Sequence, residues 1–376
     1  MSNSERFTER KPPTMKILHL SSEKTWRGGE QQIYYLHEQL LLAGHSSVVF
    51  CRRGSAMSQR LIEKNLPLKE ASFSSAYDIG SAWELKTYCK QHNIDVVHAH
   101  TSKGHTLVMI SHALGNKSQI VLSRRVDVPI KDNWWSKYKY NHQSIKKIIC
   151  VSDKIKEITA TGLASPDKLT TIHSGVNIAR LSHEKKHKPL QKEFPELQDK
   201  VIIGNVSALS DHKDFGTFIA VAKKLISIRQ NLHFLIVGEG EFQEAIVAEI
   251  KAQHMGDHIT MTGFRNDLEN VFDTLDVFLF TSKTEGLGTT VLDALTFKVP
   301  VVATAAGGVP EIIKRHNGGL LCPVKDVQCL TDSTLRILDE PTLARQLQLA
   351  GEETAKFFSK ENTAIATLKV YAEVMS

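Results

Sequence analysis

Residues 277–294 read VFLFTSKTEGLGTTVLDA, an apolar run followed by a glycine-containing turn and the start of a predicted helix. The run Val277–Phe280 is apolar without alternation, which is typical of a strand buried on both faces of a parallel sheet. The turn contains Gly286 and Gly288. A strand, a tight turn and a helix in this order form one unit of an α/β fold.

Runs of the same kind recur along most of the chain and alternate with longer amphipathic segments. The predicted strands are Lys16–Leu20, Ser47–Cys51, Asp95–His98, Ile120–Ser123, Lys147–Val151, Thr170–His173, Val201–Val206, His233–Val237, Ile259–Met261, Val277–Phe280 and Val299–Ala303. The predicted helices include Glu30–Leu42, Ala82–His92, Phe215–Ile228, Gln243–Gln253 and Asp326–Leu338. This order predicts parallel sheets with helices on both faces.

The alternation is interrupted once, where residues 177–200 are rich in Lys, His and Pro and poor in apolar side chains. Such a composition predicts a linker between two doubly wound, Rossmann-like domains. Ligands bind at the carboxyl ends of the strands in such sheets, so we expect a cleft between two facing domains. The expected parts are a flexible tail (1–14), an N-terminal Rossmann-like domain (15–185), a linker (186–200), a C-terminal Rossmann-like domain (201–355) and a C-terminal helix (356–376) that crosses back to the first domain.

Composition limits the class of protein. The 376 residues are 41% hydrophobic and 23% charged, as in soluble globular proteins. No apolar run approaches the roughly 20 residues that span a bilayer, and the N-terminus lacks the apolar core of a signal peptide. Five scattered cysteines without a C-x-x-C motif predict neither a disulfide framework nor a zinc site. We therefore expect a cytoplasmic protein.

The formal charge of +6 favours anionic partners, which include nucleotides, lipid headgroups and nucleic acid. No nucleic-acid-binding motif accompanies the charge, so nucleic acid is not an expected partner. Residues 133–142 mix aromatic side chains with lysines. This segment predicts peripheral contact with an anionic membrane, at the cytoplasmic face of the inner membrane. A partly buried helix with a basic face is the alternative.

The groups that could take part in chemistry are concentrated in the turn that contains Gly286 and Gly288. The start of a helix after a glycine turn offers backbone N–H groups and the positive end of a helix dipole to an anion or a sugar hydroxyl. Glu285 lies in this turn, and Asp293 follows about two helical turns later. The spacing alone leaves open a plain tight turn with a solvated Glu285.

Glu285 and Asp293 resemble the E-x7-E signature of the retaining GT-B glycosyltransferases of family 4, also called glycosyltransferase group 1. The resemblance covers about residues 15 to 375 and is most specific in the C-terminal half. The matching segments are Gly28–Glu30, Asp95–His100, Gly204–Lys213, Val237–Gly240, Gly263–Arg265, Pro300–Ala303, Gly307–Glu311 and, as a turn, Gly318–Leu321.

The resemblance implies that the domain at 15–185 binds the acceptor and that the domain at 201–355 binds the nucleotide sugar. It also implies the roles of individual residues. Glu285 would contact the transferred sugar and Asp293 the ribose. Lys213 would neutralise the diphosphate, since a fixed cation beside a developing phosphate charge stabilises it. An ordinary surface lysine before a helix is the alternative for Lys213. The other donor-binding residues implied by the resemblance are Gly28, Gly29, Gly238, Gly263, Phe264, Arg265, Gly286, Leu287, Gly288 and Thr289.

Three positions depart from the family pattern. Asp293 stands where the family has a glutamate, so the ribose contact is expected to be longer. Ala208 stands five positions before Lys213, where the family has an arginine. Many relatives carry a histidine at the end of the strand Ile120–Ser123, where this chain continues with two arginines.

These departures leave the second cation of the phosphate site to be found. Arg125 is our candidate for it as a catalytic residue, and Arg124 is our candidate for binding an anionic acceptor. Arg265 is an alternative source of the charge. Pairing of either arginine with Asp127 as a structural salt bridge is a further alternative.

The family mechanism is front-side attack with retention, which requires neither a protein nucleophile nor a bound metal. The sequence contains no Asp-x-Asp pair, and we expect no metal and no cofactor beyond the nucleotide-sugar donor, with a UDP-sugar favoured. His98 and His100 have the spacing of paired ligands, but packing and cleft lining are favoured. We expect His100 to face the acceptor.

The resemblance therefore implies a hexosyltransferase-type enzyme that moves a sugar from a nucleotide sugar to a carbohydrate or lipid-linked acceptor. Its products would be surface polysaccharide, lipopolysaccharide or glycolipid. A GT-B-fold epimerase of the nucleotide sugar and a non-catalytic nucleotide-sugar-binding subunit are the alternatives, because fold does not determine function.

Overall fold

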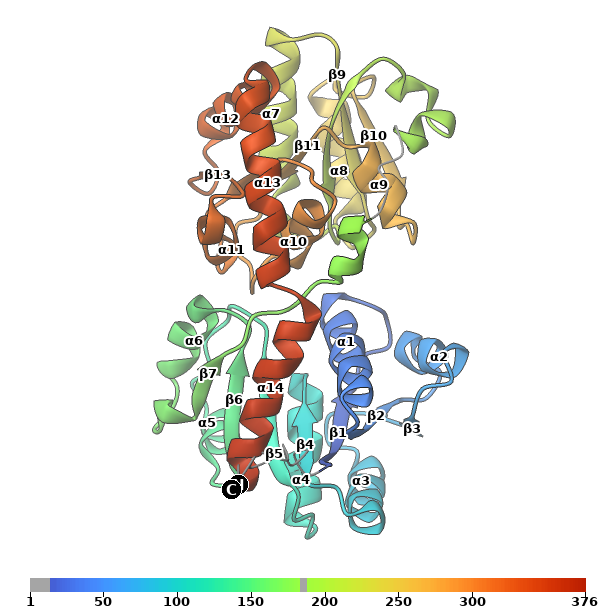
Figure 1. Cartoon of the computed structure of the whole chain (residues 1–376), viewed down its shortest axis with the longest axis vertical. Helices are drawn as coiled ribbons and strands as arrows, with labels where there is room; N and C mark the ends of the chain where they lie inside the picture. The colour runs from blue at the N-terminus through green and yellow to red at the C-terminus, as the bar shows by residue number, and fades with distance from the viewer. Residues whose placement is uncertain (1–13, 183–187) are drawn as a thin grey trace, which may run out of the picture. The chain divides into compact units, whose positions relative to one another are not determined.

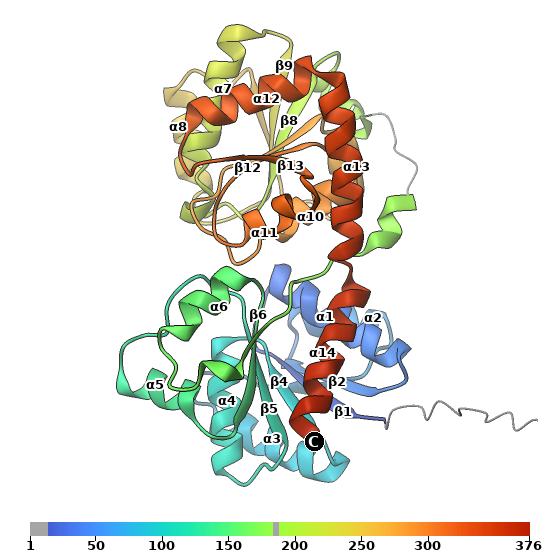
Figure 2. The same cartoon turned by 60° about the vertical axis from the view of Figure 1, so that its left-hand side comes forward.

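A computed structural model describes residues 14–182 and 188–376 (Figure 1). Residues 1–13 of the expected tail and residues 186–187 of the expected linker lie outside the described residues. Two parallel sheets are present, and helices cover both faces of each sheet, as two views show (Figures 1 and 2). The predicted α/β class with two Rossmann-like sheets is therefore confirmed.

The first sheet has seven strands in the order β3-β2-β1-β4-β5-β6-β7. Its strands are β1 (Lys16–Ser21), β2 (Ser46–Arg52), β3 (Leu68–Ala71), β4 (Val96–Ala99), β5 (Gln119–Arg124), β6 (Ile145–Cys150) and β7 (Leu169–Thr171). The helices between them are α1 (Gly28–Leu42), α2 (Ala56–Glu63), α3 (Ile79–His92), α4 (Ser102–Ala113), α5 (Trp134–Asn141) and α6 (Asp153–Ala160). Strand β3 was not predicted, because its sequence LKEA is short and half charged, as is common for an edge strand.

The second sheet has six strands in the order β10-β9-β8-β11-β12-β13. Its strands are β8 (Val201–Val206), β9 (Leu232–Val237), β10 (Ile259–Gly263), β11 (Val277–Phe280), β12 (Val301–Thr304) and β13 (Gly319–Cys322). The helices that follow β8 are α7 (Phe215–Ile228), α8 (Gln243–Ala252), α9 (Leu268–Thr274), α10 (Thr289–Thr296), α11 (Val309–His316), α12 (Val327–Asp339), α13 (Pro341–Phe357) and α14 (Lys360–Met375).

The prediction of a turn at Gly318–Leu321 is wrong for residues 319–321, which belong to the edge strand β13. This strand pairs in parallel with β12, with Val301 opposite Gly319. A Cβ atom at position 319 would lie 2.9 Å from the Val301 carbonyl oxygen. The glycine that looked like a turn residue is therefore needed for close strand packing.

The order of strands places a reversal point in each sheet. In the second sheet, β8 and β11 are neighbours, although the chain runs from β8 to β9 and β10 before it returns to β11. In the first sheet, β1 and β4 are neighbours in the same way. Loops at the carboxyl ends of such strand pairs diverge and leave a crevice in which open α/β sheets bind ligands.

Contacts along the backbone group the chain into two compact units. One comprises residues up to 123, 142–147 and 368–376, and the other comprises residues 124–141 and 148–367. The part of α14 from residue 368 onward thus belongs to the first unit. The domain boundaries expected from the sequence stay a prediction. No helix in the described ranges 14–182 and 188–376 is both long and apolar enough to cross a membrane.

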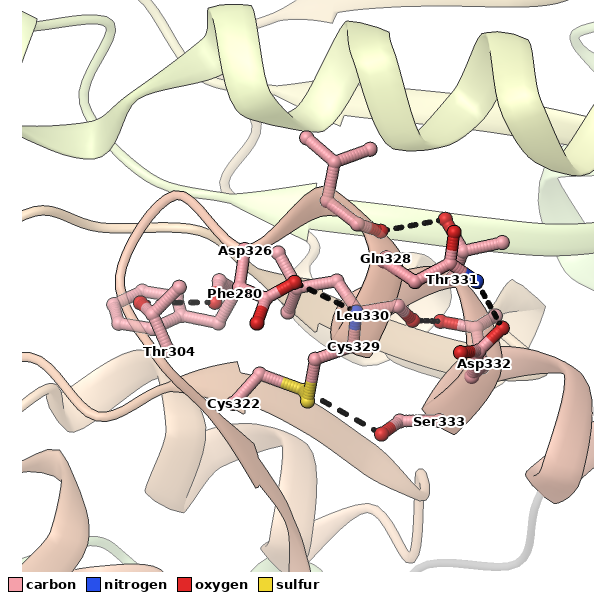
Figure 3. The surroundings of a disulfide bond; sticks show 12 residues. Phe280, Thr304, Cys322, Asp326, Gln328, Cys329, Leu330, Thr331, Asp332 and Ser333 are labelled. Atoms are coloured by element: carbon pink, nitrogen blue, oxygen red, sulfur yellow. Dashed lines mark hydrogen bonds between the residues drawn. A yellow bond between two sulfur atoms is a disulfide. The ribbon is translucent and has the colours of Figure 1, made fainter.

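The expectation for the cysteines is wrong for one pair, since a disulfide joins Cys322 and Cys329 (Figure 3). Cys322 ends β13, and Cys329 lies in the first turn of α12, whose N-terminus is capped by the carboxylate of Asp326 at 2.9 Å. The short connection between strand and helix brings the two thiols together, which a sequence separation of 7 does not reveal. Cys51, Cys89 and Cys150 are free and buried.

This disulfide predicts a specific thiol count. Unfolded wild-type protein should show three reactive thiols without reductant and five with it, and Cys329→Ser should show four under both conditions. In the chain-entropy model, closing so short a loop stabilises the fold by about 2–3 kcal/mol. Reductant should therefore lower the thermal midpoint of the wild type but not of Cys329→Ser. Five reactive thiols without reductant would contradict the pairing.

Candidate active site

Lys213 and Glu285 meet at the reversal point of the second sheet. Lys213 ends the short 3-10 helix η5 (Asp211–Lys213) after β8, and Glu285 lies in the loop after β11. The Lys213 ammonium forms an ion pair with Oε1 of Glu285, and Ser282 donates a hydrogen bond to the same oxygen at 2.9 Å. Only 12% of the lysine side chain and 11% of the glutamate side chain are exposed.

Backbone contacts hold the two loops together. The hydroxyl of Thr281 donates to the carbonyl of Lys213 at 3.1 Å, and the amide of Lys283 donates to the carbonyl of His212 at 2.7 Å. Residue 214 follows with a left-handed backbone, and its carboxylate caps α7 by accepting from the amide of Thr217 at 3.4 Å. It also accepts from the Thr217 hydroxyl at 2.8 Å. The position of the lysine is therefore fixed by the two loops and not by its side chain alone.

Lys213 can bind an anion while its ion pair with Glu285 stays intact. An ammonium group has three N–H donors, so contact with Glu285 leaves donors for a further oxygen ligand. The Lys213 nitrogen also lies 5.2 Å from the centre of the Phe280 ring, an arrangement that stabilises a cation. A largely buried charge is costly without a partner. Glu285 therefore balances the charge of Lys213 and holds the side chain in place.

Two glycines after β12 support the loop that carries Glu285. Gly307 has a φ of +52°, and a Cβ atom there would lie 1.8 Å from the Glu285 carbonyl oxygen. The amide of Gly308 donates to the same carbonyl at 3.3 Å. Gly286 has an equally close neighbour, because a Cβ there would lie 2.2 Å from the carbonyl oxygen of Arg125. The loop can follow this path only where side chains are absent.

The helix that follows the loop has an open N-terminus. Gly288, with a φ of +92°, occupies the N-cap position of α10, and no side chain caps the helix. Leu287 is buried, while Thr289 is the first helical residue. The amide end of α10 is thus available to an anion or a hydroxyl group, as predicted for this turn.

Asp293 lies one turn further along α10 and is paired with Arg180, which the sequence did not indicate. The guanidinium nitrogen of Arg180 is 3.6 Å from Oδ1 of Asp293. Burial raises the pKa of Asp293 to about 6, and the charge of Arg180 opposes this rise. Arg180 belongs to the 3-10 helix η2 (Ile178–Ser182).

Four of the expected donor-binding residues, Gly238, Gly263, Phe264 and Arg265, lie at the carboxyl ends of β9 and β10. Gly238 has a φ of +141°, and a Cβ there would lie 1.9 Å from the carbonyl oxygen of Ser207. Gly263 also has a positive φ, of +71°. The side chain of Phe264 is exposed. Arg265 is bound by two carboxylates, from Glu193 at 2.8 Å and Asp267 at 2.8 Å, so its charge is already balanced.

The two arginines after β5 have different surroundings. Arg124 is buried and donates hydrogen bonds to Tyr140 at 3.0 Å, to Thr159 at 3.3 Å and to the carbonyl of Val128. Arg125 donates to the hydroxyl of Ser174 at 3.1 Å. The contacts of Arg124 are those of a structural arginine, whereas Arg125 also touches Gly286 through its backbone.

In the first sheet, the expected residues gather at the reversal point between β1 and β4. Gly28 and Gly29 begin α1. Nε2 of His100 lies 3.1 Å from Nδ1 of His19, a buried histidine that sequence reasoning missed. Burial, followed by the charge of nearby His37, lowers the pKa of His19, so His19 is neutral. These residues belong to the other compact unit from Glu285.

Within residues 14–182 and 188–376, two groups of side chains have the donor types of a metal site. Nitrogens of His19, His98 and His100 lie within 4.8 Å of one another, but both ring nitrogens of His98 have hydroxyl partners, Tyr371 at 2.6 Å and Ser123 at 2.8 Å. These contacts agree with the packing role favoured for His98.

The second group comprises Asp153, His173 and Glu311. The Glu311 carboxylate accepts from His173 at 2.8 Å and from the amides of Asp153 and Lys154 at 2.8 and 3.0 Å. Burial would raise the pKa of Glu311, but these hydrogen bonds lower it overall. Glu311 therefore caps the N-terminus of α6.

Comparison with known proteins identifies the class that this fold and site define. The family model "Glycosyl transferases group 1" matches residues 187–354, and the model "Glycosyltransferase Family 4" matches residues 26–180. The chain belongs to the group 1 glycosyltransferases, and the resemblance seen in the sequence is confirmed.

Individual relatives are similar over most of their length. N-acetyl-alpha-D-glucosaminyl L-malate synthase of Bacillus anthracis is 21% identical over 90% of this chain and 92% of its own. An Escherichia coli UDP-Gal:alpha-D-GlcNAc-diphosphoundecaprenol alpha-1,3-galactosyltransferase is 23% identical over 71% of this chain and 72% of its own. The crystal structure of Anabaena HepE in complex with UDP and glucose has a TM-score of 0.83 at 16% identity, and covers 95% of this chain and 99% of its own.

The packing of Gly307 against Glu285 predicts that Gly307→Ala is damaging. A Cβ at this position would clash with the backbone of Glu285, and alanine is strained at the left-handed φ of residue 307. The variant should therefore lose about 2–4 kcal/mol of unfolding free energy. Chemical denaturation measures the loss. Gly256→Ala is the matched control, because a Cβ there meets nothing within 4 Å. Equal stability of the two variants would contradict the proposed support of the loop.

Proposed function

We propose that this enzyme transfers a sugar from a UDP-sugar to a carbohydrate or lipid-linked acceptor with retention of the anomeric configuration. The single observation that carries the proposal is the Lys213–Glu285 pair at the reversal point of the second sheet. A fixed ammonium there suits a diphosphate, and a carboxylate beside it suits sugar hydroxyls.

The proposed reaction breaks the bond between the anomeric carbon and the diphosphate oxygen. The acceptor oxygen forms a new bond to the same carbon from the same face, and its proton passes to the departing phosphate. Lys213 stabilises the negative charge that grows on the leaving diphosphate. Glu285 orients the sugar by accepting hydrogen bonds from its hydroxyls, and the N-terminus of α10 binds the diphosphate.

In this scheme, side chains of the protein provide the positive charge that stabilises the leaving diphosphate. Lys213 provides one cation, and Arg125, whose backbone packs against Gly286, is the candidate for the second cation in place of Ala208. We propose on this basis that transfer does not depend on a metal ion and needs no cofactor besides the donor. Asp293 is proposed to accept a hydrogen bond from the ribose.

Relatives support the classes of donor and acceptor. The name of the Escherichia coli relative specifies a UDP-sugar donor and a diphosphoundecaprenol-linked acceptor, and the Anabaena structure contains UDP. A colanic acid biosynthesis glycosyltransferase of Salmonella typhimurium is 26% identical over 54% of this chain. We therefore propose a role in making surface polysaccharide, lipopolysaccharide or glycolipid, with His100 as an acceptor contact.

An exposed surface on the second unit supports contact with the cytoplasmic face of a membrane. Trp134 is 75% exposed and stacks on Tyr138, with ring centres 5.6 Å apart. Val126 and Val128 are exposed in the same stretch of chain, which also contains Lys131 and other lysines. Aromatic rings at headgroup depth beside lysines favour anionic bilayers.

The activity prediction concerns Lys213 and Glu285. Wild-type protein should release UDP from one UDP-sugar in an acceptor-dependent way and give a product with the donor's anomeric configuration by NMR. EDTA should leave the rate unchanged. Lys213→Ala and Glu285→Gln should each lower kcat about 100-fold or more, as for loss of one preorganised group.

Lys283→Ala is the matched control for this assay. Lys283 lies two residues from Glu285, but its ammonium pairs with the exposed Asp211. The variant should retain wild-type kcat. Wild-type rates in Glu285→Gln would contradict the site assignment. An epimerised nucleotide sugar formed without acceptor would contradict transfer as the primary reaction.

The membrane prediction is that wild-type protein co-sediments with phosphatidylglycerol vesicles and not with phosphatidylcholine vesicles, and that salt weakens the binding. Trp134→Ser should reduce the affinity about fivefold. Trp83→Ser is the control, since Trp83 is another exposed tryptophan, on α3. Equal binding of Trp134→Ser and wild type would contradict the proposed surface.

A further inference from the structure

Arg180 forms an ion pair with Asp293 but does not donate a hydrogen bond to its carboxylate. The guanidinium nitrogen and the carboxylate oxygen are 3.6 Å apart, which is an ion pair but longer than a hydrogen bond. Both residues belong to the same compact unit, and their side chains are 27% and 20% exposed. The Asp293 oxygens thus remain able to accept from a hydroxyl group of a ligand.

An aromatic ring holds Arg180 in place. Its guanidinium lies 5.7 Å from the centre of the Phe297 ring, and that ring stacks on Phe272 at 5.3 Å. The amide of Phe297 in turn donates to the carbonyl of Asp293 at 3.1 Å. The aromatic support and the carboxylate are therefore parts of one local structure, and Arg180 is fixed beside Asp293.

Other charges near α10 are engaged elsewhere. Glu352 of α13 pairs with Lys298 and Lys356, and Glu311 of α11 pairs with His173. Arg315 of α11 lies over the ring of Phe357 on α13. The charge of Arg180, by contrast, acts directly on Asp293 and opposes the rise in its pKa that burial causes.

We propose that Arg180 is a positioning residue that keeps Asp293 ionised and oriented to accept a hydrogen bond from the donor ribose. The inference rests on the proposed function, in which Asp293 is the ribose contact. Arg180 does not touch the donor in this scheme. It compensates for the burial of a carboxylate that is one methylene shorter than the glutamate of the family signature.

A protonated Asp293 is a poorer hydrogen-bond acceptor. The affinity for the nucleotide should therefore decrease as the pH is lowered through the pKa of Asp293. Removal of an opposite charge at this distance raises a carboxyl pKa by about one unit or more. If the ionised form binds UDP, the affinity ratio of wild type to Arg180→Gln should be near one at pH 8.5. The ratio should rise to about fivefold at pH 6.

The experiment is calorimetric titration of UDP into the full-length protein between pH 6 and 8.5. Titration of the nucleotide's own phosphate affects every protein variant alike and cancels in the ratio. Arg180→Lys retains the charge and should follow the wild type. Arg229→Gln is the matched control, because Arg229 forms an exposed pair with Asp339. Its ratio to wild type should stay near one at every pH.

A double-variant cycle separates the inference from the proposed function on which it rests. In an Asp293→Asn background, Arg180→Gln should have no pH-dependent effect on UDP affinity. In the wild-type background, Arg180→Gln should likewise have no pH-dependent effect on the affinity for 2'-deoxy- or 3'-deoxy-UDP, whichever lacks the contacted hydroxyl. A ratio that is constant with pH would overturn the role of Arg180, provided that Asp293→Asn weakens UDP binding. Undiminished UDP binding by Asp293→Asn at pH 8.5 would instead overturn the ribose assignment itself.

Discussion

A largely buried ammonium and a largely buried carboxylate, those of Lys213 and Glu285, meet where the loops after β8 and β11 come together. Each charge would be costly to bury alone, so each loop supplies the charge that the other needs as a partner. The Thr281 hydroxyl and the Lys283 amide each donate to a carbonyl of the opposite loop, and the absence of a side chain at Gly307 lets the Glu285 loop pack closely. The proposed chemistry needs the same arrangement, because it requires a fixed cation beside a sugar-orienting carboxylate.

The parts of the fold that depend on local sequence could be predicted. Strand Val277–Phe280 and helix Phe215–Ile228 have the predicted boundaries, because a continuous apolar run and an amphipathic period each specify one structure. Parallel pairing follows from the βαβ order. Once β8 and β11 are neighbours, the loops that carry Lys213 and Glu285 must lie at the same edge of the sheet. The family resemblance, and not the fold, indicated that Lys213 and Glu285 are the functional residues at this edge.

Features that depend on distant partners could not be predicted. The sequence Gly318–Leu321 resembles a turn, but residues 319–322 form a strand because they pair with β12. The Cys322–Cys329 disulfide depends on that strand. The charge of Arg265 is balanced by Glu193, 72 positions away. Arg180 lies in a stretch whose composition indicated only a linker, and nothing in its sequence connects it with Asp293. Residue types do not reveal such pairings.

The central claim is that Lys213 binds the diphosphate of the donor, and its most direct test compares ligands that differ in phosphate. Calorimetric affinities of UDP, UMP and uridine should be measured for the wild type and for Lys213→Met. The account predicts that Lys213→Met weakens UDP binding about tenfold or more, as for loss of a charged contact, and leaves uridine binding within about twofold. An equal loss for all three ligands, or no loss for UDP, would contradict it.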